Sequence, residues 1–188
     1  GTFDTGSDQA LTVTGLCTVN GTLTGNTSAI SIGGLLVGAS GKYNATSGTT
    51  TVTAEDTTGY AWDVNGTDSF DNNDGTVLFD LGSGVDSHIR TGESDGDNSF
   101  HHLTVLLNAA ARTLVLRPNG GSAMTIEGNL TVQEGKFYQY NDNYSLTVTG
   151  DVSVESGGEL GLASTTGAIS FGSLTIASGG TYIATSGT

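Results

Sequence analysis

The sequence predicts an all-β chain folded as a parallel β-helix (β-solenoid) with short repeated strands. Three observations predict it: long internal repeats, a period-two alternation of apolar and polar residues, and almost no helix signal. The chain has 188 residues with 30 Gly and one Pro, and 35% of its residues are hydrophobic. These residues recur in short ordered runs, which indicates a folded chain despite the net charge of −14.

The first observation is a passage that occurs twice. Leu11-Thr-Val-Thr-Gly15 returns unchanged as Leu146-Thr-Val-Thr-Gly150, an offset of 135 residues (146 minus 11). Residues 28–49 align without gaps with residues 167–188, with 12 identities in 22 positions. Self-similarity of this length is typical of repeat architectures.

A third, looser copy lies between these two. Ala123-Met-Thr-Ile126 and Leu130-Thr-Val132 precede Gly135-Lys-Phe137, in the order of the last copy. We therefore expect residues 1–134 to form one long repeat unit of stacked β-coils, and residues 135–188 to be the truncated start of a second unit. Tyr43, Phe137 and Tyr182 occupy matching repeat positions, which predicts one stacked structural layer.

The second observation is a strand pattern. The tripeptide Leu-Thr-Val or Leu-Thr-Ile places its first and third side chains on one face of a strand, and it begins at Leu11, Leu103, Leu130, Leu146 and Leu174. Clusters of Gly, Asn, Asp and Ser between these runs supply turns. We expect strands of about four to six residues and about seven to nine coils of roughly 20 to 28 residues. At ~4.8 Å per coil, the rod would be roughly 35 to 45 Å long.

The third observation is the weakness of the helix signal. The best candidate, Leu106 to Arg112, is flanked by β-type runs, so we expect a turn or bulge there. An array of β-sandwich domains is the alternative fold, because sandwiches also consist of short strands joined by turns. Stacked coils are favoured because they explain why the same strand and turn sequences return within one chain.

Composition excludes several partners. The 5 basic side chains are outnumbered by 19 acidic ones and stand isolated, so we expect no nucleic-acid binding. No stretch approaches the ~18 consecutive apolar residues of a membrane span, so we expect no membrane insertion. Cys17 is the single cysteine, which excludes disulfides within the chain and metal motifs built from Cys pairs.

Three runs between Tyr60 and Val105 have an informative order: Trp62-Asp-Val-Asn-Gly66, Ser69 to Asp80, and Ser99-Phe-His-His-Leu-Thr-Val105. This order resembles the repeats of large bacterial and phage surface proteins. His102 stands where those repeats usually have Asn, and Gly92 to Asn98 is an insertion. The resemblance implies a β-solenoid, adhesin-like or fibre-like segment without a catalytic centre, and it does not choose between a cell and a virus.

Two acidic loops offer oxygen ligands that suit calcium. They contain Asp71 and Asp74 in one case and Asp95 and Asp97 in the other. Neither has the full EF-hand spacing, and Asp, Asn and Gly are common in plain turns. We assign no catalytic, cofactor-binding or metal-binding residue, and we keep structural calcium as the less favoured alternative.

Aromatic residues suggest a glycan-binding face as a second hypothesis. Trp62, with Tyr60, Phe70, Tyr138, Tyr140 and Tyr144, would form a platform for sugar rings if it were exposed. Packing in the core is the favoured role, and the exposure of Trp62 separates the two.

A polysaccharide lyase or hydrolase is the third hypothesis. It would need an acidic groove with a nearby base, and Arg117 beside Pro118 is the candidate, although Pro118 also suits the end of a strand. Gly92-Glu-Ser-Asp-Gly96 matches a nucleophile elbow by letter only, since no strand and helix flank it. His101 and His102 are adjacent, so in a regular strand they would point to opposite faces and not share a metal.

The sequence therefore favours a non-catalytic structural module of a larger extracellular fibre or surface adhesin. A viral tail fibre or capsid-attached fibre with a glycan-binding role is the alternative, followed by the lyase. We expect the chain to contact its own continuation or like subunits, because an open coil end exposes unpaired strand groups. A homo-oligomer or a surface glycan would be the other partners, at a cell or virion surface.

Overall fold

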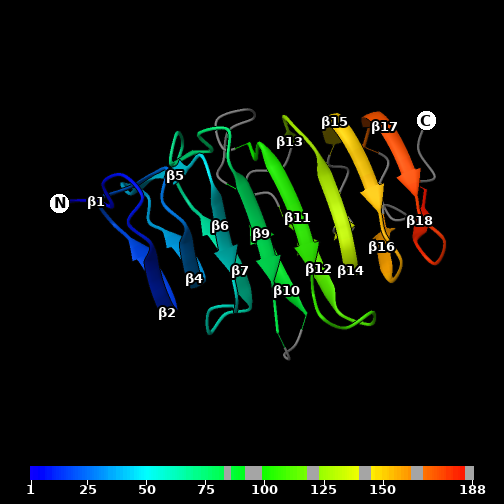
Figure 1. Ribbon diagram of the computed structural model, residues 1–188, viewed down its shortest axis with the longest axis horizontal. Helices are drawn as coiled ribbons and strands as arrows, with labels where there is room; N and C mark the ends of the chain where they lie inside the picture. Colours follow the sequence, from blue (N-terminus) through cyan, green and yellow to red (C-terminus); the bar gives the residue numbers. More distant parts are fainter. Residues whose placement is uncertain (83–85, 92–98, 118–122, 140–144, 162–166, 185–188) are drawn as a thin grey trace.

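The computed structural model describes residues 1–82, 86–91, 99–117, 123–139, 145–161 and 167–184, and it confirms the all-β prediction (Figure 1). The described residues form 18 strands and no helix. Their strand pairings are parallel, and the strands stack in about 7 turns. This arrangement is a β-solenoid, so the β-sandwich alternative is wrong.

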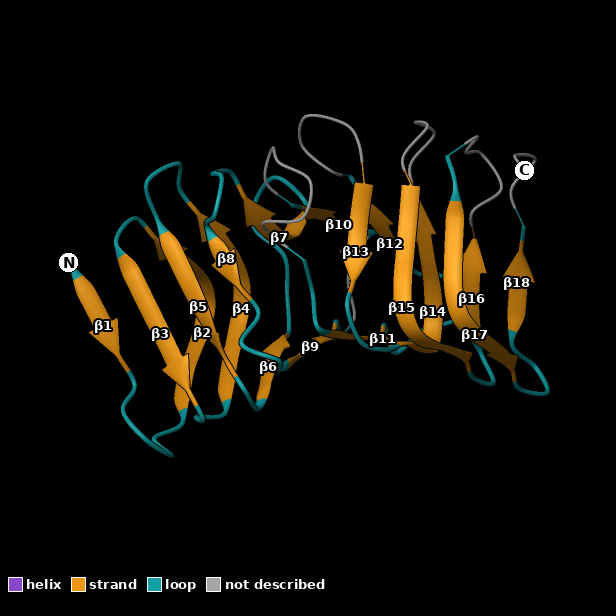
Figure 2. Ribbon diagram, turned by 90° about the horizontal axis from the view of Figure 1, so that it is seen from above, coloured by secondary structure: helices purple, strands orange, loops and turns teal. Residues whose placement is uncertain are grey.

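Each turn of the chain passes through three sheet faces, which we number in the order the chain visits them. Face 1 consists of β1 (Thr2–Asp4), β3 (Thr22–Asn26), β5 (Lys42–Thr46), β8 (Phe70–Asp71), β13 (Ala123–Ile126) and the first parts of β15 (Ser145–Val154) and β17 (Ile169–Ile176). Figure 2 shows this face in front, from β1 to β15.

Face 2 contains three whole strands: β6 (Thr49–Val52), β9 (Thr76–Asp80) and β11 (His102–Leu106). It also contains the N-terminal halves of three longer strands: β2 (Leu11–Val19), β4 (Ile30–Val37) and β14 (Leu130–Gln139). The C-terminal halves of β15 and β17 complete it. Face 3 consists of the second parts of β2, β4 and β14, and of β7 (Tyr60–Val64), β10 (Ser87–Arg90), β12 (Thr113–Leu116), β16 (Gly158–Gly161) and β18 (Thr181–Ile183). The chain ends lie at opposite ends of the rod (Figure 1).

The face 2 ladder gives the length of each turn. It runs Leu11, Ile30, Thr50, Val77, Leu103, Leu130, Val152, Leu174. Successive members are 19 to 27 residues apart, which agrees closely with the predicted coil length. About 7 turns at ~4.8 Å give a rod of roughly 34 Å, just below the predicted range.

Five strands are longer than predicted because they bend around a corner and belong to two faces. These strands have 8 to 10 residues: β2, β4, β14, β15 and β17. Glycine fits the corner because turns stack closely there. A Cβ on Gly33 would lie 2.6 Å from the Gly15 carbonyl oxygen, and one on Gly172 would lie 2.5 Å from that of Thr149. Corner glycines therefore allow successive turns to approach.

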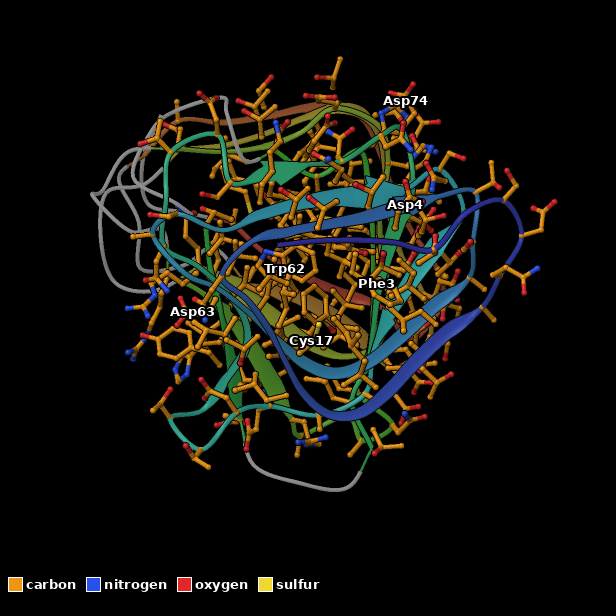
Figure 3. All side chains as sticks on the ribbon, turned by 90° about the vertical axis from the view of Figure 1, so that its left-hand side faces the viewer. Phe3, Asp4, Cys17, Trp62, Asp63 and Asp74 are labelled. Atoms are coloured by element: carbon orange, nitrogen blue, oxygen red, sulfur yellow. The ribbon has the colours of Figure 1, made fainter. Side chains whose placement is uncertain are left out.

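The core is a continuous column of inward side chains with an aromatic cluster in its centre. Trp62 contacts Tyr43, Phe70, Phe79 and Phe100, with ring centroids 4.9 to 6.2 Å apart. The buried Tyr43 hydroxyl forms a 2.7 Å hydrogen bond with the Thr50 hydroxyl, so its polar atom is satisfied. Viewed from the N-terminal end, Trp62 lies inside the column (Figure 3).

Two further expectations can be compared with these elements. Residues 107–112 form the turn between β11 and β12, which confirms that Leu106 to Arg112 is not a helix. The strand β14 runs through the boundary between residues 134 and 135, so the chain path is continuous there. The division into two repeat units remains a prediction from sequence.

The prediction that Tyr43, Phe137 and Tyr182 form one stacked layer is wrong for Tyr43. Phe137 and Tyr182 belong to face 3, where Leu160 lies between them, whereas Tyr43 belongs to face 1. Positions that match in sequence can therefore lie on different faces, because the repeat does not contain a whole number of turns.

Candidate functional site

The densest group of polar side chains follows the outer edge of face 1 over three successive turns. The Asn72 amide donates to the Ser99 carbonyl oxygen and to Glu127 Oε2, each at 3.2 Å, and Ser99 Oγ donates to Glu127 Oε1. Ser99 directly precedes Phe100, Glu127 directly follows Ile126, and Asn72 lies two residues after Phe70, and all three of these apolar residues are buried. The packing of the face 1 core therefore positions this polar ladder.

His101 adds an imidazole to the ladder. Its Nδ1 lies 3.4 Å from Asp74 Oδ1 and 3.8 Å from Glu127 Oε2. Its ring centroid is 4.4 Å from that of His102, so the prediction that the two side chains point to opposite faces is wrong. The reason is that β11 begins at His102, and His101 lies in the bend before it, where strand alternation does not apply.

The ladder is suited to holding turns together. The hydrogen bond from Ser99 lowers the pKa of Glu127, which keeps this carboxylate ionised and makes it a weak proton acceptor at neutral pH. The described hydrogen bonds of the Ser99 side chain lead to Glu127 and Asn72, not to a histidine. A base that activates a serine must take up its proton, and the lowered pKa of Glu127 makes this carboxylate a poor acceptor.

The loop after β8 contains two of the calcium candidates. Asp71 Oδ1 accepts a hydrogen bond from the Asn73 backbone at 3.2 Å, and Asp74 has a positive φ of 56° with a side chain that is 86% exposed. In the described part of the chain, no group of three or more His, Cys, Asp and Glu side chains could hold a metal ion. Asp95 and Asp97 lie outside the described residues, so calcium there remains untested.

A second polar cluster lies on the outside of face 3. Arg90 Nε donates to Asp63 Oδ1 at 2.6 Å, and its Nη2 donates to Asp63 Oδ2 at 2.5 Å. The same guanidinium lies over the Tyr60 ring, 4.6 Å from the centroid. The Asp63 side chain is only 5% exposed, so Arg90 both neutralises it and shields it from water. In Figure 3, Asp63 lies outside the column that contains Trp62.

Neither polar cluster was found from the sequence, although a signal exists. The partners are 27 residues apart in the pairs Arg90–Asp63 and Asn72–Ser99, and 28 apart in Ser99–Glu127. These separations equal one turn of the central coils. Once the coil length is known, polar residues one turn apart become candidates for such ladders.

The proposed sugar platform does not form around Trp62. Trp62 has 0% exposure and Phe70 has 3%, so neither presents a face to a glycan. Tyr60 is partly covered by Arg90, and the Tyr138 hydroxyl donates to Glu159. Tyr140 and Tyr144 lie outside the described residues.

The lyase candidates are only partly described. Arg117 is half-buried, and its backbone N–H donates to the Ile89 carbonyl oxygen at 2.8 Å, which extends the face 3 ladder past β12. Pro118 and the whole of Gly92 to Gly96 lie outside the described residues, so their proposed roles are untested. No helix in the described part of the chain is long and apolar enough to cross a membrane.

The two ends of the rod are the remaining surfaces, and both expose large apolar residues. Phe3 is 56% exposed and Leu16 is 41% exposed at the N-terminal end. At the C-terminal end, Leu174 and Ile176 are 39% and 46% exposed. The N-terminal end also has a cavity of about 430 Å³ whose walls include Phe3 and the half-buried Cys17. Phe3 and Cys17 face the viewer inside the ring of strands in Figure 3.

Comparison with known proteins adds no relative: no protein-family model, curated protein or solved structure matches the chain. The resemblance to bacterial and phage surface repeats therefore remains an expectation from sequence.

Proposed function

We propose that the chain is a structural repeat module of a larger extracellular fibre or surface adhesin, and that it acts by length and stiffness without catalysing a reaction. The observation that carries the proposal is the continuous core, whose inward side chains are exposed at both ends of the stack. Exposed ladder groups and apolar side chains favour contact with further coils.

The sides of the rod support the same proposal. The two polar clusters each link one turn to the next, and each satisfies its own charged groups. The pKa of Glu127 is lowered, which suits an ion pair or hydrogen-bonded carboxylate more than a proton-transfer group. The net charge of −14 helps to keep such a rod soluble and repels polyanions.

The proposal is tested by locating the chain on the particle that carries it. Antibodies raised against residues 1–188 should label intact cells or virions, and electron cryo-microscopy should show a continuous coil stack in a surface fibre. Labelling only after lysis would overturn the surface location. A closed, isolated domain in the density would overturn the fibre.

The lyase alternative has its own test. The chain is incubated with a panel of neutral and acidic polysaccharides, and the release of new sugar ends is measured. The structural proposal expects no turnover above a boiled control. Turnover that is abolished by Arg117→Ala would overturn it in favour of the enzyme.

A further inference from the structure

The passage that occurs twice in the sequence has the same local structure in both copies. Both β2 and β15 bend at a Thr-Gly pair, and each shows a register shift there against the next turn. The following turns also match: the Gly41 amide donates to Gly38 at 2.8 Å, and the Gly180 amide donates to Ala177 at 2.9 Å. The repeat is therefore structural as well as sequential.

The two copies nevertheless lie on different faces. Leu11 begins the face 2 ladder, and six pairings along that ladder reach Val152. Leu146 lies on face 1 of the same turn as Val152, one face earlier along the chain. The step from Leu11 to Leu146 is thus six turns less one third, which is five and two-thirds turns.

The second matching segment shows the same displacement. Leu35 lies on face 3 and its counterpart Leu174 lies on face 2. Tyr43 lies on face 1 and its counterpart Tyr182 lies on face 3. Each pair is separated by one face in the same direction, so the whole repeated passage is turned by one third of a revolution.

The exposed C-terminal residues of β17 have buried counterparts in β4. Leu35 and Val37 have 0% exposure because β7 pairs with them through Trp62 and Val64. Their counterparts Leu174 and Ile176 are 39% and 46% exposed. The difference is the missing neighbour, and the residues that cover the buried copy belong to the coil of residues 49–71.

We propose that the C-terminal surface of β17 and β18 binds a coil of the same sequence type as residues 49–71, supplied in tandem and turned by one face. The strand equivalent to β7 would then cover Leu174 and Ile176 on face 2. This proposal rests on the proposed function. Successive units would advance by ~27 Å, and each would present its equivalent surface one face further round the rod.

The test extends the chain by its own sequence. Because residues 167–188 match residues 28–49, appending a copy of residues 50–134 after Thr188 continues the repeat. Amide hydrogen exchange is compared in the original and extended chains. We expect the amides of β17 and β18 to exchange at least 10-fold more slowly in the extended chain, because a covering strand protects them.

Disulfide formation between engineered cysteines shows whether the appended coil is turned by one face. Ser31 and Thr51 are neighbours in the ladder, so the turned arrangement places the appended copy of Thr51 beside Ser170. An arrangement without rotation would keep that copy on face 2, beside Thr175. Two extended variants, Ser170→Cys or Thr175→Cys, each with a cysteine in the appended copy of Thr51 and with Cys17→Ser, are oxidised and analysed by mass spectrometry. Neighbouring residues on paired strands are within reach of a disulfide.

A disulfide from position 170 with exchange protection is the expected result. A disulfide from position 175 alone would overturn the rotation. Unchanged exchange in the extended chain would overturn the docking, and concentration-dependent dimers of the original chain would then identify a second copy as the occupant. These readouts follow coil docking only, so failure of the surface-labelling test would reject the fibre role without altering them.

Discussion

Truncation of Phe100 should destabilise the chain far more than truncation of Phe3, although both belong to the inward row of face 1. Phe100 has 0% exposure and its ring contacts Trp62, Phe70 and Phe79 at centroid distances of 5.3, 5.6 and 6.5 Å. A Phe100→Ala change removes a buried ring and leaves a cavity, which costs about 3–5 kcal/mol. Phe3 is 56% exposed, so Phe3→Ala should cost about 1 kcal/mol.

The assay is urea unfolding followed by two signals. Far-UV circular dichroism reports the whole stack, and the fluorescence of Trp62, the single tryptophan, reports the central coils. Coils interact with their nearest neighbours, so we expect the fluorescence transition of Phe100→Ala to move to lower urea with a loss of about 4 kcal/mol. If the two variants lose the same free energy of unfolding within ~0.5 kcal/mol, the central aromatic cluster does not stabilise the rod as described.

Three further predictions concern the corner and the two polar clusters. Gly33→Ala should cost about 1–3 kcal/mol because its Cβ would lie 2.6 Å from a backbone oxygen, whereas Gly34→Ala, with 3.5 Å to its nearest neighbour, should cost under ~0.5 kcal/mol in the same urea assay. Arg90→Met should cost about 3 kcal/mol because it leaves the Asp63 carboxylate buried and unpaired. Adding Asp63→Asn should recover part of this loss. Equal unfolding free energies for the single and double variants would contradict this. Ser99→Ala should raise the pKa of Glu127 towards its ordinary value, measured by NMR titration of the carboxyl carbon, and an unchanged pKa would reject the role of the hydrogen bond.

The pH dependence of stability follows from the lowered pKa of Glu127. A carboxyl group with a lowered folded-state pKa stabilises the protein above its unfolded pKa, about 4.5, and this contribution is lost as the pH falls through the folded value. Wild-type unfolding in urea should therefore show a larger acid loss than Ser99→Ala. A parallel fall of both proteins between pH 6 and pH 3 would contradict this expectation.

The fold could be predicted from sequence because its determinants are local and repeated. Leu-Thr-Val runs alternate with period two, and Thr14-Gly15 recurs as Thr149-Gly150, so the strands and corners are visible one by one. The expected coil length of roughly 20 to 28 residues comes from known solenoid repeats. Parallel stacking then follows, since each turn can bury its apolar row only against its neighbours.

The polar clusters and the face of each copy could not be predicted in the same way. The Asn72–Ser99–Glu127 ladder depends on which residues of successive turns lie side by side, and this changes with every insertion in a loop. Tyr43 and Tyr182 show the difficulty, because they occupy matching positions in closely similar sequences and still lie on different faces. Only the summed length of all intervening turns determines the face.

The direction of the hydrogen bonds gives the rod a characteristic response to tension. The ladders run from turn to turn, along the line that joins the two chain ends (Figure 1). A pulling force on the ends would therefore separate one turn at a time, beginning at a terminal coil. A turn of 19 to 27 residues adds ~4.8 Å to the folded rod but ~65–90 Å to the extended chain. The molecule would thus lengthen more than tenfold in discrete steps under load. Each step would unfold one turn and leave the covalent chain intact.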